Sequence, residues 1–258
     1  LAHGCYWRKC TFCDINLDYI DRYDASGSDF IVDRMNELYK ENGIGTFHFV
    51  DEACPPVQLA RISKQLVKQG SNYSWYGNIR FDKAFNHKIT ASMAKAGCVG
   101  VTGGIEVASD RLLKLIDKGT SVKQVTKVCQ AFRDEGIIVH GYLIFGFPTQ
   151  TLQETVDSLE VVRQLFEENL LHSAFWHQFS VTKHSPIGLD PGKYKIQLYR
   201  PNLKVAAPNG RFALYRILHR DLVEQPKTEL GVGLNAALNN YMFRHGFDAN
   251  VEAPSASL

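Results

Sequence analysis

The chain has 258 residues, of which 45% are hydrophobic and 22% charged, so it is long and apolar enough to bury a large core. Its formal net charge of +2 gives no electrostatic footprint for nucleic acid, and no apolar run approaches the roughly 18 residues of a membrane-spanning helix. We therefore expect a globular protein of the cytoplasm that binds neither a membrane nor nucleic acid.

The first feature along the chain is a loop with three cysteines, Cys5, Cys10 and Cys13, spaced C-x4-C-x2-C. So short a span can bring three thiolates to one metal centre, whereas structural zinc sites and ferredoxin-type clusters take four ligands. The loop therefore predicts an iron–sulfur cluster with one iron left open for chemistry. A zinc loop closed by His3 is the alternative.

The other cysteines and the first residues of the chain indicate the compartment and the extent of the protein. The other cysteines are scattered singly, which is not the pattern of a secreted disulfide scaffold and favours a reducing cytosol. Leu1 stands only four residues before Cys5, and we expect the chain to be a fragment of a longer protein.

Strand-like and helix-like segments alternate after the loop. The strand-like runs are Thr46 to Val50, Tyr73 to Phe81, Val99 to Val107, Ile137 to Phe147 and Ala174 to Val181. The helix-like runs are 29–42, 55–70, 86–95, 109–118, 121–135 and 151–171, and most are followed by a glycine. Such alternation indicates parallel βα units.

This order predicts an α/β fold, a partial (β/α)6 TIM-like barrel of parallel strands with outer helices. A sixth strand is expected before the cysteine loop, with residues 1–4 as its tail. Sites of such barrels lie at the C-terminal strand ends. The residues expected there are Cys5, Cys10, Cys13, Asp51, Glu52, Arg80 and Glu106. Strand aromatics, among them Tyr76 and Phe175, are expected to fill the core or line the barrel.

The composition changes near Pro201, so we divide the chain into a core barrel at residues 1–200 and a C-terminal extension at 201–258. The extension is predicted to be small and mainly helical, with a turn at 208–210, a helix from Arg211 to Val223 and a second helix after Gly233. The small, polar tail at 249–258 is expected to be frayed.

Three motifs resemble the core domain of the radical S-adenosylmethionine (SAM) superfamily over roughly residues 3–190. The first is the cysteine loop, with Phe12 before its last cysteine. The second is GGIEVASDRLL at 103–113 with DKG at 117–119, and the third is GYLIFGFPTQT at 141–151. With FVDEA at 49–53, they look most like the cobalamin-associated group. The cysteine spacing departs from the family's usual C-x3-C.

The resemblance implies a [4Fe–4S] cluster on the three cysteines, with SAM bound to the fourth iron. SAM would be cleaved reductively to a 5′-deoxyadenosyl radical that abstracts hydrogen from a substrate. Phe12 would meet adenine, Asp51 and Glu52 the methionyl ammonium, Arg80 the methionyl carboxylate, and Glu106 the ribose hydroxyls or the substrate. Each could instead be structural, and no catalytic residue is assigned.

The implied activity is that of a transferase. It would be methylation, with cobalamin carried by a domain outside this chain, or the modification of a peptide or natural product. The implied partners are a small-molecule or peptide substrate and an electron donor such as flavodoxin or ferredoxin. Two alternatives stay open: a tRNA methylthiotransferase-like enzyme, which the near-neutral charge argues against, and a metal-stabilised binding module with a degenerate SAM site.

Overall fold

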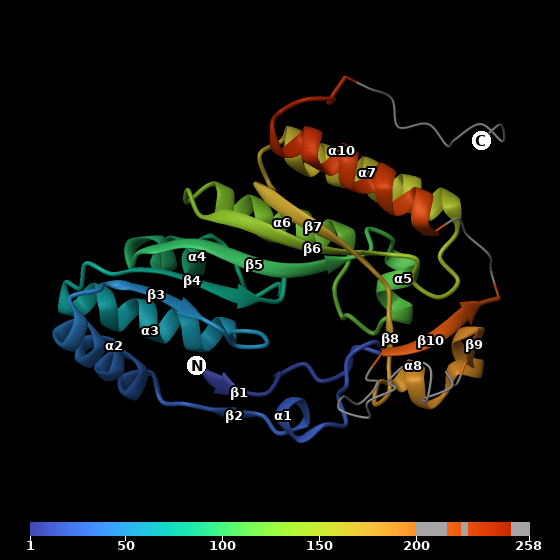
Figure 1. Ribbon diagram of the computed structural model, residues 1–258. Coiled ribbons are helices and arrows are strands. Elements are labelled where there is room, and N and C mark those ends of the chain that lie inside the picture. Colours follow the sequence, from blue (N-terminus) through green and yellow to red (C-terminus); the bar gives the residue numbers. More distant parts are fainter. Residues whose placement is uncertain (200–215, 223–226, 249–258) are drawn as a thin grey trace.

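The computed structural model describes residues 1–199, 216–222 and 227–248. Its centre is a parallel sheet of five strands in the order β3-β4-β5-β6-β7 (Figure 1). The strands are β3 (Thr46–Phe49), β4 (Ser74–Ile79), β5 (Cys98–Glu106), β6 (Ile138–Phe145) and β7 (Ser173–Gln178). All five strands predicted after the cysteine loop are thus present, and the predicted α/β fold is confirmed as an open sheet, without a closed barrel in the described residues.

Helices connect the strands. They are α2 (Ser28–Asn42), α3 (Pro56–Gln69), α4 (His87–Lys95), α5 (Asp110–Leu115), α6 (Val122–Arg133) and α7 (Leu152–Glu167). The side chains of Asn86, Ser121 and Thr151 cap the starts of α4, α6 and α7. Gly43 and Gly70 end α2 and α3 in the left-handed conformation. These local signals place the helices within a few residues of the prediction.

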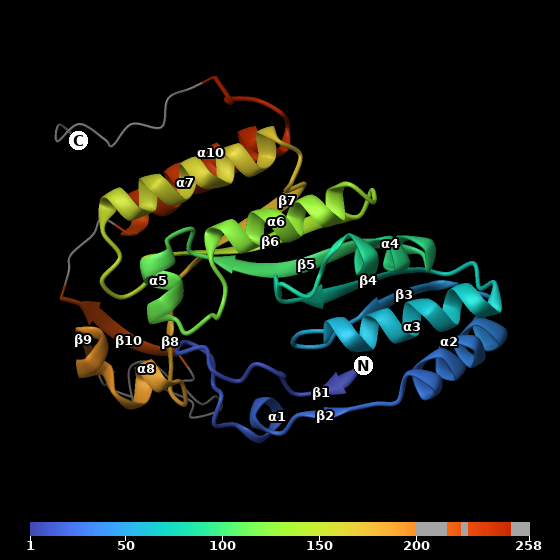
Figure 2. The same ribbon diagram turned by 180° about the vertical axis from the view of Figure 1, so that it is seen from behind.

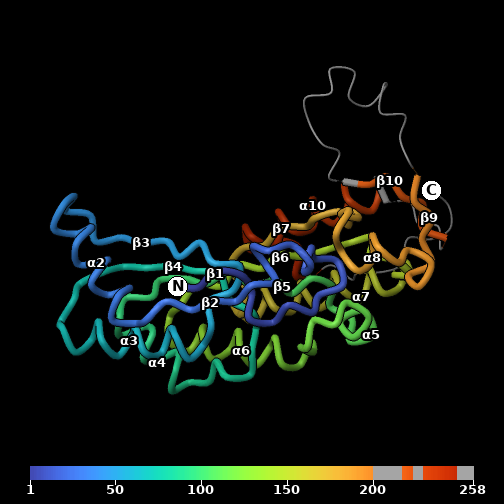
Figure 3. Tube along the Cα trace, turned by 90° about the horizontal axis from the view of Figure 1, so that it is seen from below, coloured from blue at the N-terminus to red at the C-terminus, as the bar shows by residue number. Residues whose placement is uncertain are grey.

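The two faces of the sheet differ in character. Figure 3 shows α3, α4 and α6 together on one side of it. Burial alternates along β4, where Trp75 and Ile79 are buried while Tyr76 is partly exposed. It alternates along β7 too, where Trp176 is buried and Phe175 is exposed. Because strand residues point alternately to opposite faces, one face carries the core and the other stays open.

Residues 1–4, predicted to be the tail of the sixth strand, do not join the parallel sheet. Residues 2–3 form β1 (Ala2–His3), which pairs antiparallel with β2 (Asp24–Ala25). The cysteine loop and the short helix α1 (Asp18–Asp21) lie between these two strands, and α2 follows them. The amide of Ala2 donates to the Asp51 carboxylate at 2.6 Å, so it is not used in a ladder with β3. Gly4 then turns the chain at a φ of 74° against the backbone of Arg22.

The C-terminal part differs from the prediction. Residues 216–221, expected within a helix from Arg211 to Val223, form strand β10 (Arg216–Asp221), which pairs antiparallel with β8 (Val181–Thr182) and β9 (Ile196–Tyr199). Between them lie α8 (Pro186–Leu189) and the 3₁₀ turn η1 (Pro191–Tyr194). Exposure alternates along β10, so pairing with distant strands overrides the apolar spacing that fitted a helix.

The second predicted helix is present as α10 (Lys227–Met242), although it starts before Gly233. It lies along α7 (Figures 1 and 2), and its Leu234, Leu238 and Tyr241 belong to the main core. The predicted turn at 208–210 and the tail at 249–258 lie outside the described residues, and the division at residue 200 stays a prediction. No helix in the described ranges is both long and apolar enough to cross a membrane.

Candidate functional site

A cleft of about 330 Å³ opens at the C-terminal ends of the strands. All eight residues proposed from the sequence line it: Cys5, Cys10, Phe12, Cys13, Asp51, Glu52, Arg80 and Glu106. They come from the loop after β1 and from the ends of β3, β4 and β5. The parallel strands therefore bring these residues together, as strand-end placement predicted, while their roles stay predictions.

Hydrogen bonds hold the cysteine loop from two sides. The amide of Thr11 donates to the carbonyl of Ile116 at 2.8 Å, and its carbonyl accepts from Ile187 at 3.1 Å. The buried Asp14 carboxylate accepts from the Thr182 hydroxyl at 2.7 Å and the His184 amide at 3.0 Å. The loop is thus fixed by the end of α5 and by the segment around β8.

Trp7 anchors the long first half of the loop. Its indole N–H donates to the carbonyl of Asp117 at 2.7 Å, and the Cζ atom of Arg80 lies 4.2 Å from a ring centroid of Trp7. Gly119 has a φ of 68°, and a Cβ atom there would lie 2.1 Å from the indole. The indole can occupy this place only because residue 119 is glycine, which adopts a positive φ without strain and has no Cβ atom to clash with the ring.

The thiols of Cys10 and Cys13 interact directly. Their hydrogen bond lowers the pKa of Cys10 to about 7, against the opposing effect of burial, and the positive charge of Lys118 adds to the lowering. The same hydrogen bond, with burial, raises the pKa of Cys13. The site therefore favours a thiolate at Cys10, and thiolates are the form that binds metals.

The donor set fits an iron–sulfur group. Within residues 1–199, 216–222 and 227–248, no three His, Cys, Asp or Glu side chains are grouped closely enough to hold a single metal ion. His3, the alternative zinc ligand, does not line the cleft. The three thiols share the cleft with four basic side chains, Arg8, Lys9, Arg80 and Lys118. Soft thiolates beside positive charge suit an anionic cluster.

A buried ion pair forms the floor of the cleft at the end of β5. Lys118 donates to Glu106, and both side chains are only 8% exposed. Glu106 has a φ of 63° at a register shift between β5 and β6, and its carboxylate lies over Gly104, where a Cβ atom would be 1.9 Å away. Burial alone would lower the pKa of Lys118, but Glu106 and Cys10 raise it overall, so Lys118 stays charged.

Lys118 lines the cleft, although the sequence assigns it no role. It belongs to the Asp117-Lys118-Gly119 segment of the second motif. Its neighbours Asp117 and Gly119 both have positive φ, at 55° and 68°. The chain turns at both residues and so brings Lys118 to the cleft. Asp and Gly on either side of a residue favour such turns, and this is the sequence signal that points to the position of Lys118.

Arg80 keeps an unused donor at the wall of the cleft. The residue is 5% exposed, and its Nη2 donates to the carbonyl of Lys118 at 2.6 Å. Its Nε is buried without a hydrogen-bond partner, and no carboxylate pairs with it, among the residues that the structure describes. A buried donor without a partner is costly, so this one fits a ligand acceptor.

The remaining predicted residues differ in whether their side chains are available to bind a ligand. The Asp51 carboxylate accepts from the amide of Ala2 at 2.6 Å, so its side chain is engaged by the chain itself. Glu52 is exposed, and Phe12 is half-buried against the smaller core cluster. Glu52 and the backbone after β3 are therefore the groups left to receive a ligand here.

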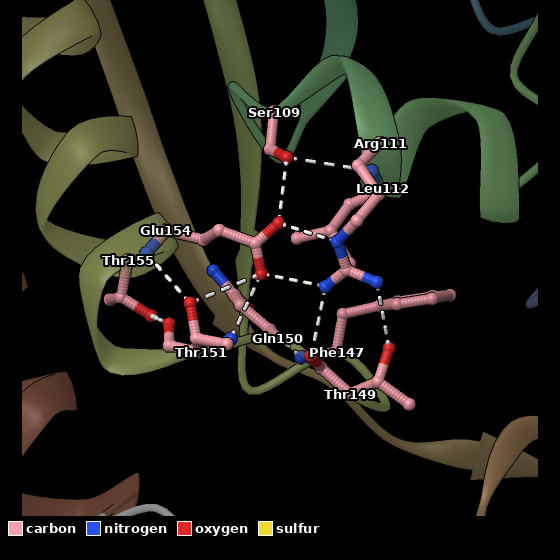
Figure 4. Close-up of polar contacts among 9 residues, drawn as sticks. All are labelled: Ser109, Arg111, Leu112, Phe147, Thr149, Gln150, Thr151, Glu154 and Thr155. Carbon is pink, nitrogen blue, oxygen red and sulfur yellow. Dashed lines mark hydrogen bonds and ion pairs between the residues drawn. The ribbon is translucent and has the colours of Figure 1, made fainter.

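The second and third motifs meet away from the cleft (Figure 4). Arg111 donates to Glu154 through Nε and Nη2, both at 2.7 Å, and to the carbonyl of Thr149 at 2.9 Å. The hydroxyl of Ser109 donates to Glu154 at 3.1 Å, and Arg111 first of all lowers the pKa of Glu154 to about 2. Gln150 accepts a backbone N–H of its own turn at 3.0 Å. This cluster joins α5 to α7 and positions the strand ends indirectly.

Comparison with curated proteins gives relatives of two kinds. An uncharacterized methyltransferase of Pyrococcus horikoshii is 28% identical over 166 residues, which cover 64% of this chain and 36% of the relative. An anaerobic magnesium-protoporphyrin IX monomethyl ester cyclase of Rubrivivax gelatinosus is 26% identical over 166 residues, covering 63% of this chain and 29% of the relative. The chain thus spans about a third of the length of the curated relatives that it matches.

Solved structures share the fold. The radical SAM methyltransferase TsrM from Kitasatospora setae, with cobalamin and a [4Fe–4S] cluster bound, superposes with a TM-score of 0.64 at 18% identity, over 78% of this chain and 41% of that one. The cobalamin-dependent SAM radical enzyme OxsB gives 0.66 at 15% identity, over 91% and 40%. The family model of the radical SAM superfamily matches residues 1–162. The chain therefore belongs to the radical SAM superfamily of enzymes.

Proposed function

We propose that the cleft holds a [4Fe–4S] cluster on Cys5, Cys10 and Cys13, with SAM beside it. The observation that carries this proposal is that the three thiols and the unused donor of Arg80 line one cleft at the strand ends. When bound, the cluster supplies the electron that cleaves SAM to methionine and a 5′-deoxyadenosyl radical, which abstracts hydrogen from the substrate.

The residues of the chain orient SAM. Arg80 binds the methionyl carboxylate, since its Nε is a buried donor without a partner in the described residues and its guanidinium lies over the Trp7 ring. Glu52 and the backbone after β3 receive the methionyl ammonium, and Phe12 offers its ring to adenine. Glu106 accepts from the ribose hydroxyls, because Lys118 holds its carboxylate over Gly104.

The reaction class follows from the relatives. The name of the Pyrococcus horikoshii relative is that of a methyltransferase, and the two solved structures are named for radical SAM chemistry with cobalamin. We propose a cobalamin-dependent transfer to a small molecule, with cobalamin supplied from outside these 258 residues. Another TsrM structure contains a tryptophan substrate, which supports a small-molecule substrate here too. A flavodoxin or ferredoxin in the cytoplasm would supply the electron.

The proposal is tested by anaerobic purification, reconstitution with iron and sulfide, reduction, and measurement of 5′-deoxyadenosine formed from SAM. We expect a cluster and SAM cleavage in the native chain and in Cys129→Ala, whose buried thiol lies in the main core. Cys5→Ala, Cys10→Ala and Cys13→Ala should lose both. A cluster without cleavage would favour a binding module, and tetrahedral zinc without iron uptake would reject the cluster.

A further inference from the structure

The open face of the sheet carries rings on four of its five strands. His48 on β3 lies opposite Tyr76 on β4, with ring centroids 4.4 Å apart. The hydroxyl of Tyr76 shares a hydrogen bond with Thr102 on β5, and Thr102 lies opposite His140 on β6. The rings on β3 and β4 are therefore linked to those on β6 through the buried hydroxyl of Thr102 on β5.

The rings continue to the far edge of the sheet. The ring of Tyr142 lies 5.2 Å from that of His140 and 5.8 Å from that of His177 on β7. His177 is in turn 4.5 Å from Phe175, which pairs across the strands with Tyr142. Tyr142 is 40% and Phe175 51% exposed. We call the six rings of His48, Tyr76, His140, Tyr142, Phe175 and His177 the ring face.

The ring face is continuous with the cleft. Tyr142 and Thr102 line the cleft, as do the cysteines and Arg80. Glu106 and Lys118 close this end of the face, and their charges neutralise each other. A molecule on the ring face would therefore lie directly beside the proposed position of SAM.

The face offers rings and hydrogen bonds but no fixed charge. The other side chains that alternate onto it in the described strands are Thr46, Ser74, Asn78, Thr102, Ile138, Ile144 and Ser173. None of these is Lys, Arg, Asp or Glu. His140 shares a 2.7 Å hydrogen bond with Ser173, and burial, with the neighbouring His177, lowers the pKa of its imidazole. A charged group placed on these strands, away from the basic side chains of the cleft, would gain no counter-charge.

We propose that the ring face binds the substrate, and that the part of the substrate lying on it is a planar, uncharged ring system. Ring edges and faces of the protein stack on such a molecule, and the imidazoles and the Tyr76 hydroxyl bind its polar edge. The proposal rests on the proposed function only in taking the adjoining cleft as the SAM site. A charged peptide would find no counter-charge on the strands of this face.

The test uses indole as the probe, titrated into the full chain with and without the reconstituted cluster and followed by saturation-transfer NMR. We expect binding in both forms. Tyr142→Ala and Phe175→Ala should each weaken it about three- to tenfold, since each removes one ring contact. Phe30→Ala is the matched control, because Phe30 is 65% exposed on α2, away from the ring face. Non-planar cyclohexanol and planar, cationic benzamidinium should bind more weakly than indole.

Several results would overturn the proposal. Indole affinity unchanged in the folded Tyr142→Ala and Phe175→Ala variants would do so, as would cyclohexanol or benzamidinium binding as tightly as indole. A dimer in solution that buries both rings would also reject it. Indole binding without SAM cleavage would reject the proposed function but not the binding role of the ring face. SAM cleavage without indole binding would reject the binding role of the ring face but not the proposed function.

Discussion

Replacing Gly119 with alanine should strongly destabilise the chain and the cysteine loop. An alanine at a φ of 68° costs about 1–2 kcal/mol. Its Cβ atom would also lie 2.1 Å from the indole of Trp7, and overpacking of this kind costs about 1–3 kcal/mol. Displacing the indole further loses its hydrogen bond to Asp117, about 1 kcal/mol. The free energy of unfolding should therefore fall by about 3–6 kcal/mol.

Gly136 provides the matched control. It has a φ of 71°, but no atom lies within 4 Å of its Cβ position, so Gly136→Ala should cost only the backbone strain of about 1–2 kcal/mol. Urea unfolding followed by circular dichroism measures both variants, and iron bound per chain after reconstitution reports on the loop. Equal losses of stability in the two variants would refute the role given to Trp7. So would full iron uptake by Gly119→Ala.

Three further predictions concern charged groups. Lys118→Met should lower the free energy of unfolding by about 3–5 kcal/mol, because it leaves the Glu106 carboxylate buried and unpaired. Adding Glu106→Gln should restore most of this stability. Equal stability of Lys118→Met and the native chain in urea would contradict the prediction. Arg80→Lys should weaken SAM binding about tenfold in calorimetry at unchanged iron content, since lysine cannot reproduce the flat, forked donor; an unchanged affinity would argue against the carboxylate role. Glu154→Gln should lower Tm at neutral pH, and this deficit should shrink as pH falls from about 4.3 towards 2. In that interval the carboxyl of the unfolded chain takes up a proton, whereas the native carboxyl, with its pKa held near 2, does so only at the lower end. A deficit constant from pH 7 to pH 3 would contradict the last prediction.

The sheet and the position of the site could be predicted because their signals are local. The run from Tyr73 to Phe81 is rich in aromatic residues, as strands often are, and β4 occupies Ser74–Ile79 within it. Since parallel strands all end at one edge of the sheet, Asp51, Arg80 and Glu106 could be placed with the cysteines before any distance was known.

Features that depend on distant partners could not be predicted in this way. The apolar spacing in residues 211–223 fits a helix, and only pairing with residues 196–199 turns 216–221 into a strand. Lys118 follows an ordinary helix-end pattern, and its burial depends on Glu106, twelve residues earlier on another element. Residues 1–4 fit the tail of a parallel strand in the sequence, but the amide of Ala2 donates to the Asp51 carboxylate instead of to a strand of the sheet.

The two faces of the sheet can evolve at different rates. Trp75 and Trp176 point into the core that holds the helices, whereas Tyr76 and Phe175, their immediate neighbours in the chain, contribute mainly to the open surface. Substitutions on the open face therefore cost little stability, since few buried contacts are lost. If the ring face binds the substrate as proposed, saturation of these positions should change substrate preference while the cysteine loop and the fold that carries it stay unchanged.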